Sequence, residues 1–325
     1  MLKEKKRTIS RLTNVLFTFV LMLGYNEVCA QRIININEES TAYQVQLRKQ
    51  AMLAGIPQDY RKEAKAARAF ALNPALQRSA GVSIGDNVRL QLFEGDDFMA
   101  QVSDKVVDVN GTLALTLKLP DYPLGFAIIT TSKEGRSLVT ISIPELGRIF
   151  GSRYGADARE SYLIEVDESK IERPHDENDA VPFPEGKEIL EGGSAPQLRD
   201  APYCGPTYKE NVNDPATVDL LIVYTSAAAS SSYASSHGGI NNVISSMISL
   251  GNTCMTNSNT GITLRLAHSA QVDYTETDMY TSLEHLSSTN DGYMDNIHAL
   301  RKEYKADLVQ LLSIDTNYGG LGYTL

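Results

Sequence analysis

The chain has 325 residues, which is more than one hydrophobic core usually supports, so at least two domains are expected. A hydrophobic share of 42% and a charged share of 22% are typical of globular proteins and exclude a collagen-like or wholly disordered chain. The formal net charge of −10 argues against nucleic-acid binding, because phosphate contacts require clustered Lys and Arg.

Residues 1–30 have the pattern of a secretory signal peptide. Five basic residues precede a short apolar run, Val15–Gly24, and a small residue, Ala30, comes directly before Gln31. The run is too short to span a bilayer, which requires about 20 apolar residues. We therefore expect cleavage before Gln31 and a secreted protein, periplasmic or extracellular, with no integral membrane anchor after cleavage.

Residues 31–79 are predicted to form a helical segment, because five alanines between Ala64 and Ala71 are strong helix formers and Pro74 ends the run. Residues 80–170 are predicted to form a β-rich antiparallel domain. The turn dipeptides Asn110-Gly111 and Glu134-Gly135 separate short runs with strand character. These runs are Val88–Leu92, Leu113–Leu117, Phe126–Thr130, Leu138–Ile143 and Tyr162–Val166.

Residues 171–216 are rich in Asp, Glu, Pro and Gly, which buries little apolar area and predicts an extended, protease-accessible linker. Residues 217–325 then alternate between strand and helix patterns. The order is strand, helix, strand, helix, strand, which predicts a parallel sheet with crossover helices. The elements are Val218–Tyr224, Ile240–Gly251, Ile262–Leu266, Tyr293–Tyr304 and Asp307–Ser313.

No zinc-hydrolase motif is visible in the chain. None of its five histidines lies four residues from another, so HExxH is absent and each is expected to be a surface or loop histidine. Gly81–Gly85 fits G-x-S-x-G around Ser83, but it precedes a predicted strand instead of following one, so we predict a turn rather than a serine nucleophile.

Cys204 lies near the end of the linker and has three possible roles. It could form a disulfide with Cys254, remain a free thiol, or, as a thiolate, occupy the open position of a catalytic zinc. The residues alone favour the first two.

The third part of the chain resembles a family. Val218–Thr225, Ser258–His268, Asp291–Arg301 and Ala306–Leu312 are similar to the amino-terminal half of a reprolysin-like metzincin, closest to the bacterial peptidyl-Asp metalloendopeptidases. Leu90–Glu94 is similar to that family's propeptide. The resemblance implies an α+β, β-rich propeptide followed by the first part of an α/β metzincin-like peptidase domain. It further implies that the peptidase sheet is mixed and mostly parallel.

The resemblance also implies chemistry. The function would be a secreted zinc metalloendopeptidase zymogen that hydrolyses protein or peptide substrates. Cys204, followed by Gly205, would be the inhibitory zinc ligand of the latent form, and Gly320, Leu321, Gly322 and Tyr323 would form the edge strand that binds substrate. The zinc ligands, general base and Met-turn of the family motif HExxHxxGxxH match no position here. We therefore expect the chain to be truncated, with the zinc ligands beyond residue 325, and to be inactive by itself.

Two further expectations follow. Cleavage before Asp would make the Asn213–Asp214 bond a candidate self-processing site. The alternative to an enzyme is a secreted, non-catalytic binding or inhibitory protein built from metzincin-like parts.

Overall fold

The computed structural model describes residues 32–38, 63–155, 161–170, 180–182, 215–315 and 320–324. All of these except Arg32 belong to one compact unit, Ile33–Leu325. The predicted signal peptide lies outside the described residues. None of the helices described in these ranges has both the length and the apolar character needed to cross a bilayer.

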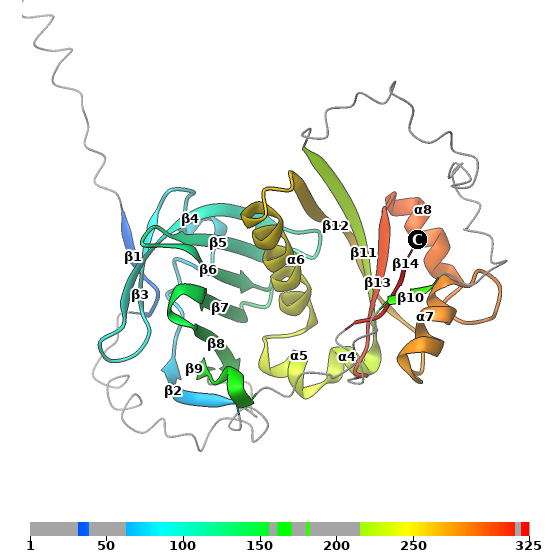
Figure 1. Ribbon diagram of the computed structural model, residues 1–325, viewed down its shortest axis with the longest axis horizontal. Coiled ribbons are helices and arrows are strands. Elements are labelled where there is room, and N and C mark those ends of the chain that lie inside the picture. The colour runs from blue at the N-terminus through cyan, green and yellow to red at the C-terminus, as the bar shows by residue number, and fades with distance from the viewer. Residues whose placement is uncertain are drawn as a thin grey trace, which may run out of the picture. The chain divides into compact units, whose positions relative to one another are not determined.

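The amino-terminal part of this unit is a nine-stranded sheet with the order β1-β3-β4-β5-β6-β7-β8-β9-β2 (Figure 1). All neighbouring strands are antiparallel except β1 and β3, which are parallel. The strands are β1 (Ile33–Asn35), β2 (Ala64–Phe70), β3 (Asn87–Gln91), β4 (Asp97–Val107), β5 (Leu113–Leu119), β6 (Tyr122–Thr131), β7 (Ser137–Ile143), β8 (Arg148–Tyr154) and β9 (Ser161–Val166). Short 3-10 helices occur at Ser79–Gly81, Pro144–Leu146 and Glu168–Lys170.

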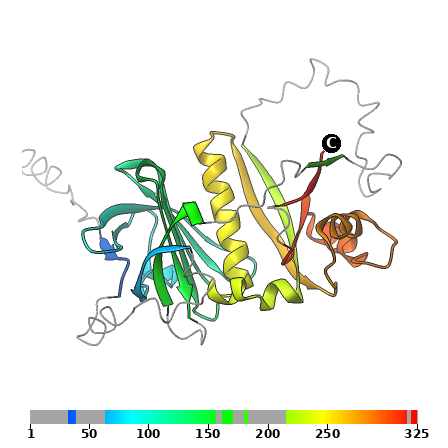
Figure 2. The same ribbon diagram turned by 60° about the horizontal axis from the view of Figure 1, so that its bottom comes forward.

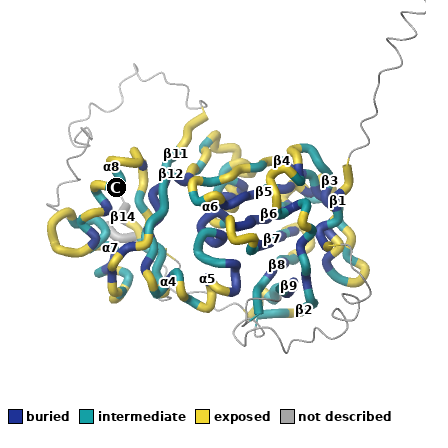
Figure 3. Tube along the Cα trace, turned by 180° about the vertical axis from the view of Figure 1, so that it is seen from behind, coloured by how far each residue is buried: buried dark blue, intermediate teal, exposed yellow. Residues whose placement is uncertain are grey.

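The core of this sheet follows from alternation along its strands. On β5, Leu115 and Leu117 are completely buried, and both belong to a cluster that includes Phe150 on β8. Figure 3 shows buried positions recurring along these strands. All five predicted strands of this region are confirmed. The two predicted turns are confirmed as well, with Gly111 and Gly135 at φ values of 79° and 81°.

The helical prediction for the alanine-rich run is wrong. Ala64–Phe70 is strand β2, which pairs antiparallel with β9, so that Ala67 lies opposite Ile164. Ala64 and Ala67 pack against buried Tyr162 and Ile164, while Phe70 enters the main core. Helix propensity is a weak preference per residue, and here the contacts of the sheet edge override it.

The carboxy-terminal part contains a parallel three-stranded sheet with the order β12-β11-β13, which confirms the predicted crossover arrangement. Its strands are β11 (Ala216–Thr225), β12 (Ile262–Val272) and β13 (Leu308–Leu312). The helices are α4 (Ser226–Ser230), α5 (Ser232–Ser236), α6 (Ile240–Asn257), α7 (Met279–Ser287) and α8 (Asn296–Tyr304). The described strands of this sheet are all parallel, whereas the resemblance implied a mixed sheet.

Helices cover both faces of this small sheet. Successive residues of β11 point to opposite sides of the sheet. Ile222 packs with Ile244 of α6, and Val223 packs in the same cluster as Ile297 of α8. The other side of α6 contacts β5, β6 and β7 of the nine-stranded sheet (Figure 2). One further pair of strands, β10 (Ala180–Pro182) and β14 (Gly322–Thr324), forms a separate parallel two-stranded sheet.

Candidate substrate cleft

Helix α8 leads into the edge strand β13 through a C-terminal cap in which Lys305 has a left-handed backbone conformation. Lys305 adopts φ 54°, and the guanidinium of Arg301 donates hydrogen bonds to the carbonyl oxygens of Ala306 at 3.1 Å and Asp307 at 2.9 Å. These bonds satisfy carbonyl groups in the turn that follows the helix. The entry angle of β13 is therefore fixed by side-chain contacts as well as by its strand pairing.

Two aspartates set the start of β13 against β11. The backbone N–H of Asp219 donates to Oδ2 of Asp307 at 2.8 Å, and the N–H of Asp307 donates to the carbonyl of Asp219, also at 2.8 Å. The Asp219 carboxylate accepts two hydrogen bonds from Arg265 of β12, which lower its pKa. All three strands are thus joined by polar contacts at this end of the sheet.

Glu276 joins two of the strands at their carboxyl ends. One carboxylate oxygen accepts a hydrogen bond of 2.8 Å from the N–H of Ile314, just after β13, and the other accepts the hydroxyl of Thr225, the last residue of β11. Thr225 is completely buried and also caps α4 by accepting from the N–H of Ala228. Sequence analysis did not single out Glu276, because a lone carboxylate in a loop has no characteristic spacing.

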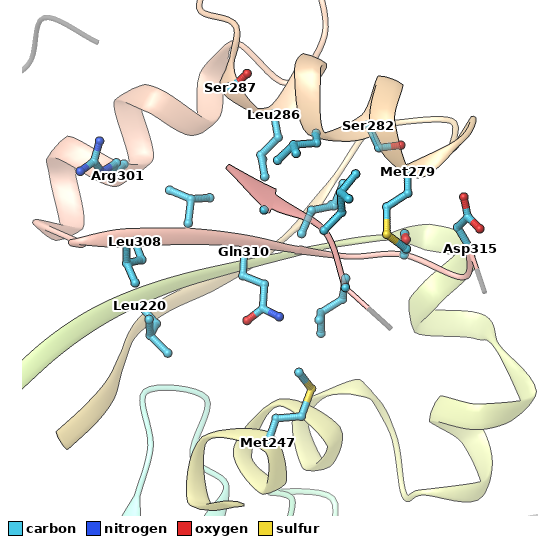
Figure 4. Close-up of a pocket in the computed structure, with 18 of the residues that line it drawn as sticks. Leu220, Met247, Met279, Ser282, Leu286, Ser287, Arg301, Leu308, Gln310 and Asp315 are labelled. Carbon is cyan, nitrogen blue, oxygen red and sulfur yellow. The ribbon is translucent and has the colours of Figure 1, made fainter. Parts of the chain in front are cut away.

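A cavity of about 770 Å³ lies along β13 (Figure 4). Figure 4 shows Met279, Ser282 and Leu286 of α7 on one side of β13. Met247 of α6 lies on the other side, toward which Gln310 of β13 points. Its walls are largely aliphatic, and Leu308 on β13 is 57% exposed. A sheet edge beside an apolar cavity can accept an extended peptide, since the backbone offers hydrogen bonds and the walls accommodate side chains.

The segment predicted to bind substrate reaches this cavity but not the expected sheet. Gly320, Leu321 and Gly322 line the cavity. Gly322 and Tyr323 belong to β14, which pairs with β10 of the linker, with Tyr323 opposite Val181. The expectation that these residues form the edge strand of the peptidase sheet does not match this pairing, while their role in substrate binding stays a prediction.

The cysteines and the serine motif occupy different surroundings. Cys204 lies outside the described residues, whereas Cys254 is an exposed, free thiol on α6. Ser83 precedes β3, and its carbonyl accepts the N–H of Asp86 at 3.1 Å in a turn. The context of Ser83 is therefore not the strand–turn–helix of a nucleophile elbow.

The described histidines do not assemble a metal site. His298 borders the cavity with Nε2 2.6 Å from the carbonyl oxygen of Ser288, and His285 contacts the hydroxyl of Tyr274 at 2.9 Å. Across the described ranges, no three His, Cys, Asp or Glu side chains form a group that could hold a metal ion. These residues therefore do not fit a zinc centre.

The carboxy-terminal part of the chain, which contains the cleft, is similar to known metallopeptidases. Residues 214–325 match the model of Metallo-peptidase family M12 (Reprolysin_5). A peptidyl-Asp metalloendopeptidase of Xanthomonas campestris pv. campestris is 33% identical over 215 residues, which are 65% of this chain and 46% of the relative. A peptidyl-Asp metalloendopeptidase of Stenotrophomonas maltophilia strain R551-3 is 32% identical over 56% of this chain and 40% of its own length.

The chain thus spans less than half the length of these curated relatives. Among solved structures, a chaperone–substrate complex matches 32% of this chain and 83% of its own, at 17% identity and a TM-score of 0.25, a value too low to assign the fold. The family implies a metal ion, typically zinc. Over residues 214–325 the chain is therefore similar to the metallopeptidases of family M12.

Proposed function

We propose that this chain carries the signal peptide, the propeptide and the first part of the peptidase domain of a secreted zinc metalloendopeptidase. The observation that carries the proposal is the family M12 match over residues 214–325, which include every residue that lines the cavity beside β13. The zinc ligands would then be supplied by residues outside the described part of the chain, because the described residues do not fit such a site.

In this proposal, the residues of this chain bind and orient the substrate. The edge of β13 and the segment Gly320–Gly322 border the cavity, so an extended peptide can lie between them. Aliphatic side chains such as Leu308 and Leu286 exclude water from the bound peptide, which strengthens its backbone hydrogen bonds. Peptide bonds beside Asp are the proposed targets, since the relatives are named peptidyl-Asp metalloendopeptidases.

Latency is proposed to come from the linker, residues 171–216. Its strand β10 pairs with β14 directly beside the cavity, which supports a role as an occupant of the substrate edge. Cys204, 22 residues beyond Pro182, is proposed as the inhibitory thiolate. Cleavage at Asn213–Asp214 would separate both features from the peptidase domain.

The test uses protein exported by the natural host, with two fluorogenic peptides that differ only by Asp or Asn at the cleavage position. We expect hydrolysis of the Asp peptide, loss of activity with 1,10-phenanthroline and recovery with zinc. The 325-residue chain, which contains no HExxH, is expected to be inactive in the same assay. An exported protein that hydrolyses neither peptide would favour the alternative, a non-catalytic binding or inhibitory protein.

A further inference from the structure

Helix α6 is buried on both of its long sides. Ile244 packs onto the three-stranded sheet with Leu220 and Ile222, whereas Val243, only 8% exposed, lines a cavity with residues of the nine-stranded sheet. The nine-stranded domain therefore covers α5 and α6, on the side of α6 away from the three-stranded sheet. This contact is separate from the pairing of β10 with β14.

Polar contacts fix the position of α5 and α6 against the nine-stranded domain. The amide of Asn242 donates to the carbonyl of Arg136 at 2.8 Å, and the guanidinium of Arg136 donates to the carbonyl of Ser235 at 2.9 Å. Gly238 lies at the same junction with φ 82°, and a Cβ there would come within 2.6 Å of the Asn242 amide nitrogen and 3.3 Å of the Tyr154 ring. The two surfaces therefore fit closely.

His237, at the end of α5, lies inside this interface. Its side chain borders a cavity of about 210 Å³ shared with β6, β7, β8 and β9, and the residue is only 4% exposed. Nδ1 lies 2.7 Å from the carbonyl oxygen of Tyr233 and 3.1 Å from the hydroxyl of Ser236, and the ring stacks on Tyr233 at 3.9 Å. The imidazole is therefore held in place within the contact.

The charged groups around His237 disfavour a proton on it. Arg153 of β8 lines the same cavity, and Arg136 lies above the neighbouring Tyr154 ring at 4.5 Å. No carboxylate is among the described residues that line the cavity. Burial, together with the charge of Arg153, lowers the pKa of His237 to about 3.

We propose that the α5–α6 face is a noncovalent binding surface for the nine-stranded domain, which stays bound after the linker is cut and is released in acid when His237 is protonated. The proposal rests on the proposed function, because it assigns a second step to propeptide removal. Cleavage of one bond within residues 171–214 breaks the covalent link between the two domains. The hydrogen bonds made by Asn242 and Arg136 between them remain.

The sign of the pH effect follows from linkage. When the domains separate, His237 regains an ordinary pKa near 6.5, whereas in the complex its pKa is about 3. Binding is therefore undiminished above the free value and weakens as the pH falls below it. Between the two values each pH unit weakens the complex about tenfold, so at about pH 5 the dissociation constant is roughly 30-fold higher than at neutral pH.

The test inserts a specific protease site between residues 172 and 178 of the 325-residue chain, which is then cut, so that β10 and its partner β14 stay on the same fragment. We expect the two fragments to co-elute in size exclusion at neutral pH and to separate, with the roughly 30-fold rise in dissociation constant, at about pH 5. The variant His237→Gln should remain associated at both pH values, whereas His268→Gln, altered on β12, should behave like the original chain. Fragments that separate at neutral pH, or whose affinity does not depend on pH, would overturn the proposal.

A second measurement covers the case in which His237→Gln does not fold. In the uncut original chain, the NMR signals of His237 should show a neutral imidazole down to about pH 5. Titration near its ordinary pKa with the domains still associated would also overturn the proposal. Neither measurement uses peptidase activity, so failure of the zinc-peptidase proposal and failure of this one give different results.

Discussion

The side-chain amide of Asn242 on α6 donates a hydrogen bond of 2.8 Å to the backbone carbonyl of Arg136, in the turn between β6 and β7. A second bond of 3.0 Å reaches the carbonyl of Gly238. Asn242 is completely buried, so water cannot replace the amide as donor. One side chain thus links the nine-stranded domain to the helices that cover the three-stranded sheet.

Substituting Asn242→Ala should therefore lower the free energy of unfolding by about 1–3 kcal/mol, because the carbonyl groups of Arg136 and Gly238 each lose a hydrogen bond from a buried donor. Urea unfolding followed by circular dichroism measures the change. Asn257→Ala, at the exposed end of the same helix, is the matched control and should have little effect. Equal stabilities for the two variants would contradict the assigned role of Asn242.

Arg148 holds two carboxylates together at the rim of the nine-stranded sheet. It donates to Asp96 at 2.7 Å and 2.8 Å and to Glu165 at 3.0 Å, and both carboxylate side chains are at most 14% exposed. Arg148→Met leaves both charges without this partner, so we expect a loss of roughly 3 kcal/mol in the free energy of unfolding. Arg89→Met removes a solvent-exposed pair with Asp97 and should change stability little.

The same cluster predicts a pH dependence. Burial raises the pKa of Glu165, but hydrogen bonds from Arg148 and Lys65 outweigh it, so that the net pKa is lowered. A lowered pKa contributes stability that is present above the ordinary value of about 4.5 and is lost as the pH falls through the folded-state value. Unfolding of the original chain and of Glu165→Gln, followed from neutral pH into acid, should show a shallower acid loss for the variant. Identical slopes would argue against this source of pH dependence.

Glu276 should hold the carboxyl ends of β11 and β13 in place. In Glu276→Ala the N–H of Ile314 and the hydroxyl of Thr225 lose their acceptor, so a loss of about 1–2 kcal/mol is expected. Hydrogen exchange of the Ile314 amide should become faster in this variant. Glu284→Ala, on the exposed side of α7, should leave that amide unchanged. An unchanged exchange rate in Glu276→Ala would show that the strand ends are held by other contacts.

The pairing of β10 with β14 predicts how the linker is protected. Replacing Ala180–Pro182 by three glycines should weaken the strand, because glycine pays more conformational entropy and offers no side chain to pack. Limited proteolysis of the linker, monitored by mass spectrometry, should then be severalfold faster than in the original chain. The same replacement at residues 188–190 serves as the control and should change the rate less. Equal rates would mean that this strand pairing does not shield the linker.

Much of the architecture could be predicted from local patterns. Alternation along Leu113–Leu119 and the continuous apolar run of β11 each reflect how a strand buries its side chains, and these strands are present. The alanine-rich run was mispredicted, because its strand state depends on Tyr162 and Ile164, almost 100 residues away. The sequence around Ala64–Phe70 gives no sign of these distant packing partners, so a local pattern could not predict the strand.

The candidate cleft was predicted less completely than the fold. Gly320–Gly322 were identified by resemblance and do border the cavity, but the pairing of β14 with β10 joins segments 142 residues apart. Glu276 and His237 owe their surroundings to contacts between separate elements. The sequence provides the residue types, whereas the tertiary contacts bring them together.

We propose that the whole protein is a metallopeptidase whose targets lie beside Asp. The most direct measurement is mass spectrometry of a peptide mixture after incubation with the protein exported by its natural host, with and without 1,10-phenanthroline. We predict new peptide ends at Asp residues, absent with the chelator and restored by zinc. Cleavage that persists with the chelator, or no cleavage at all, would contradict the account.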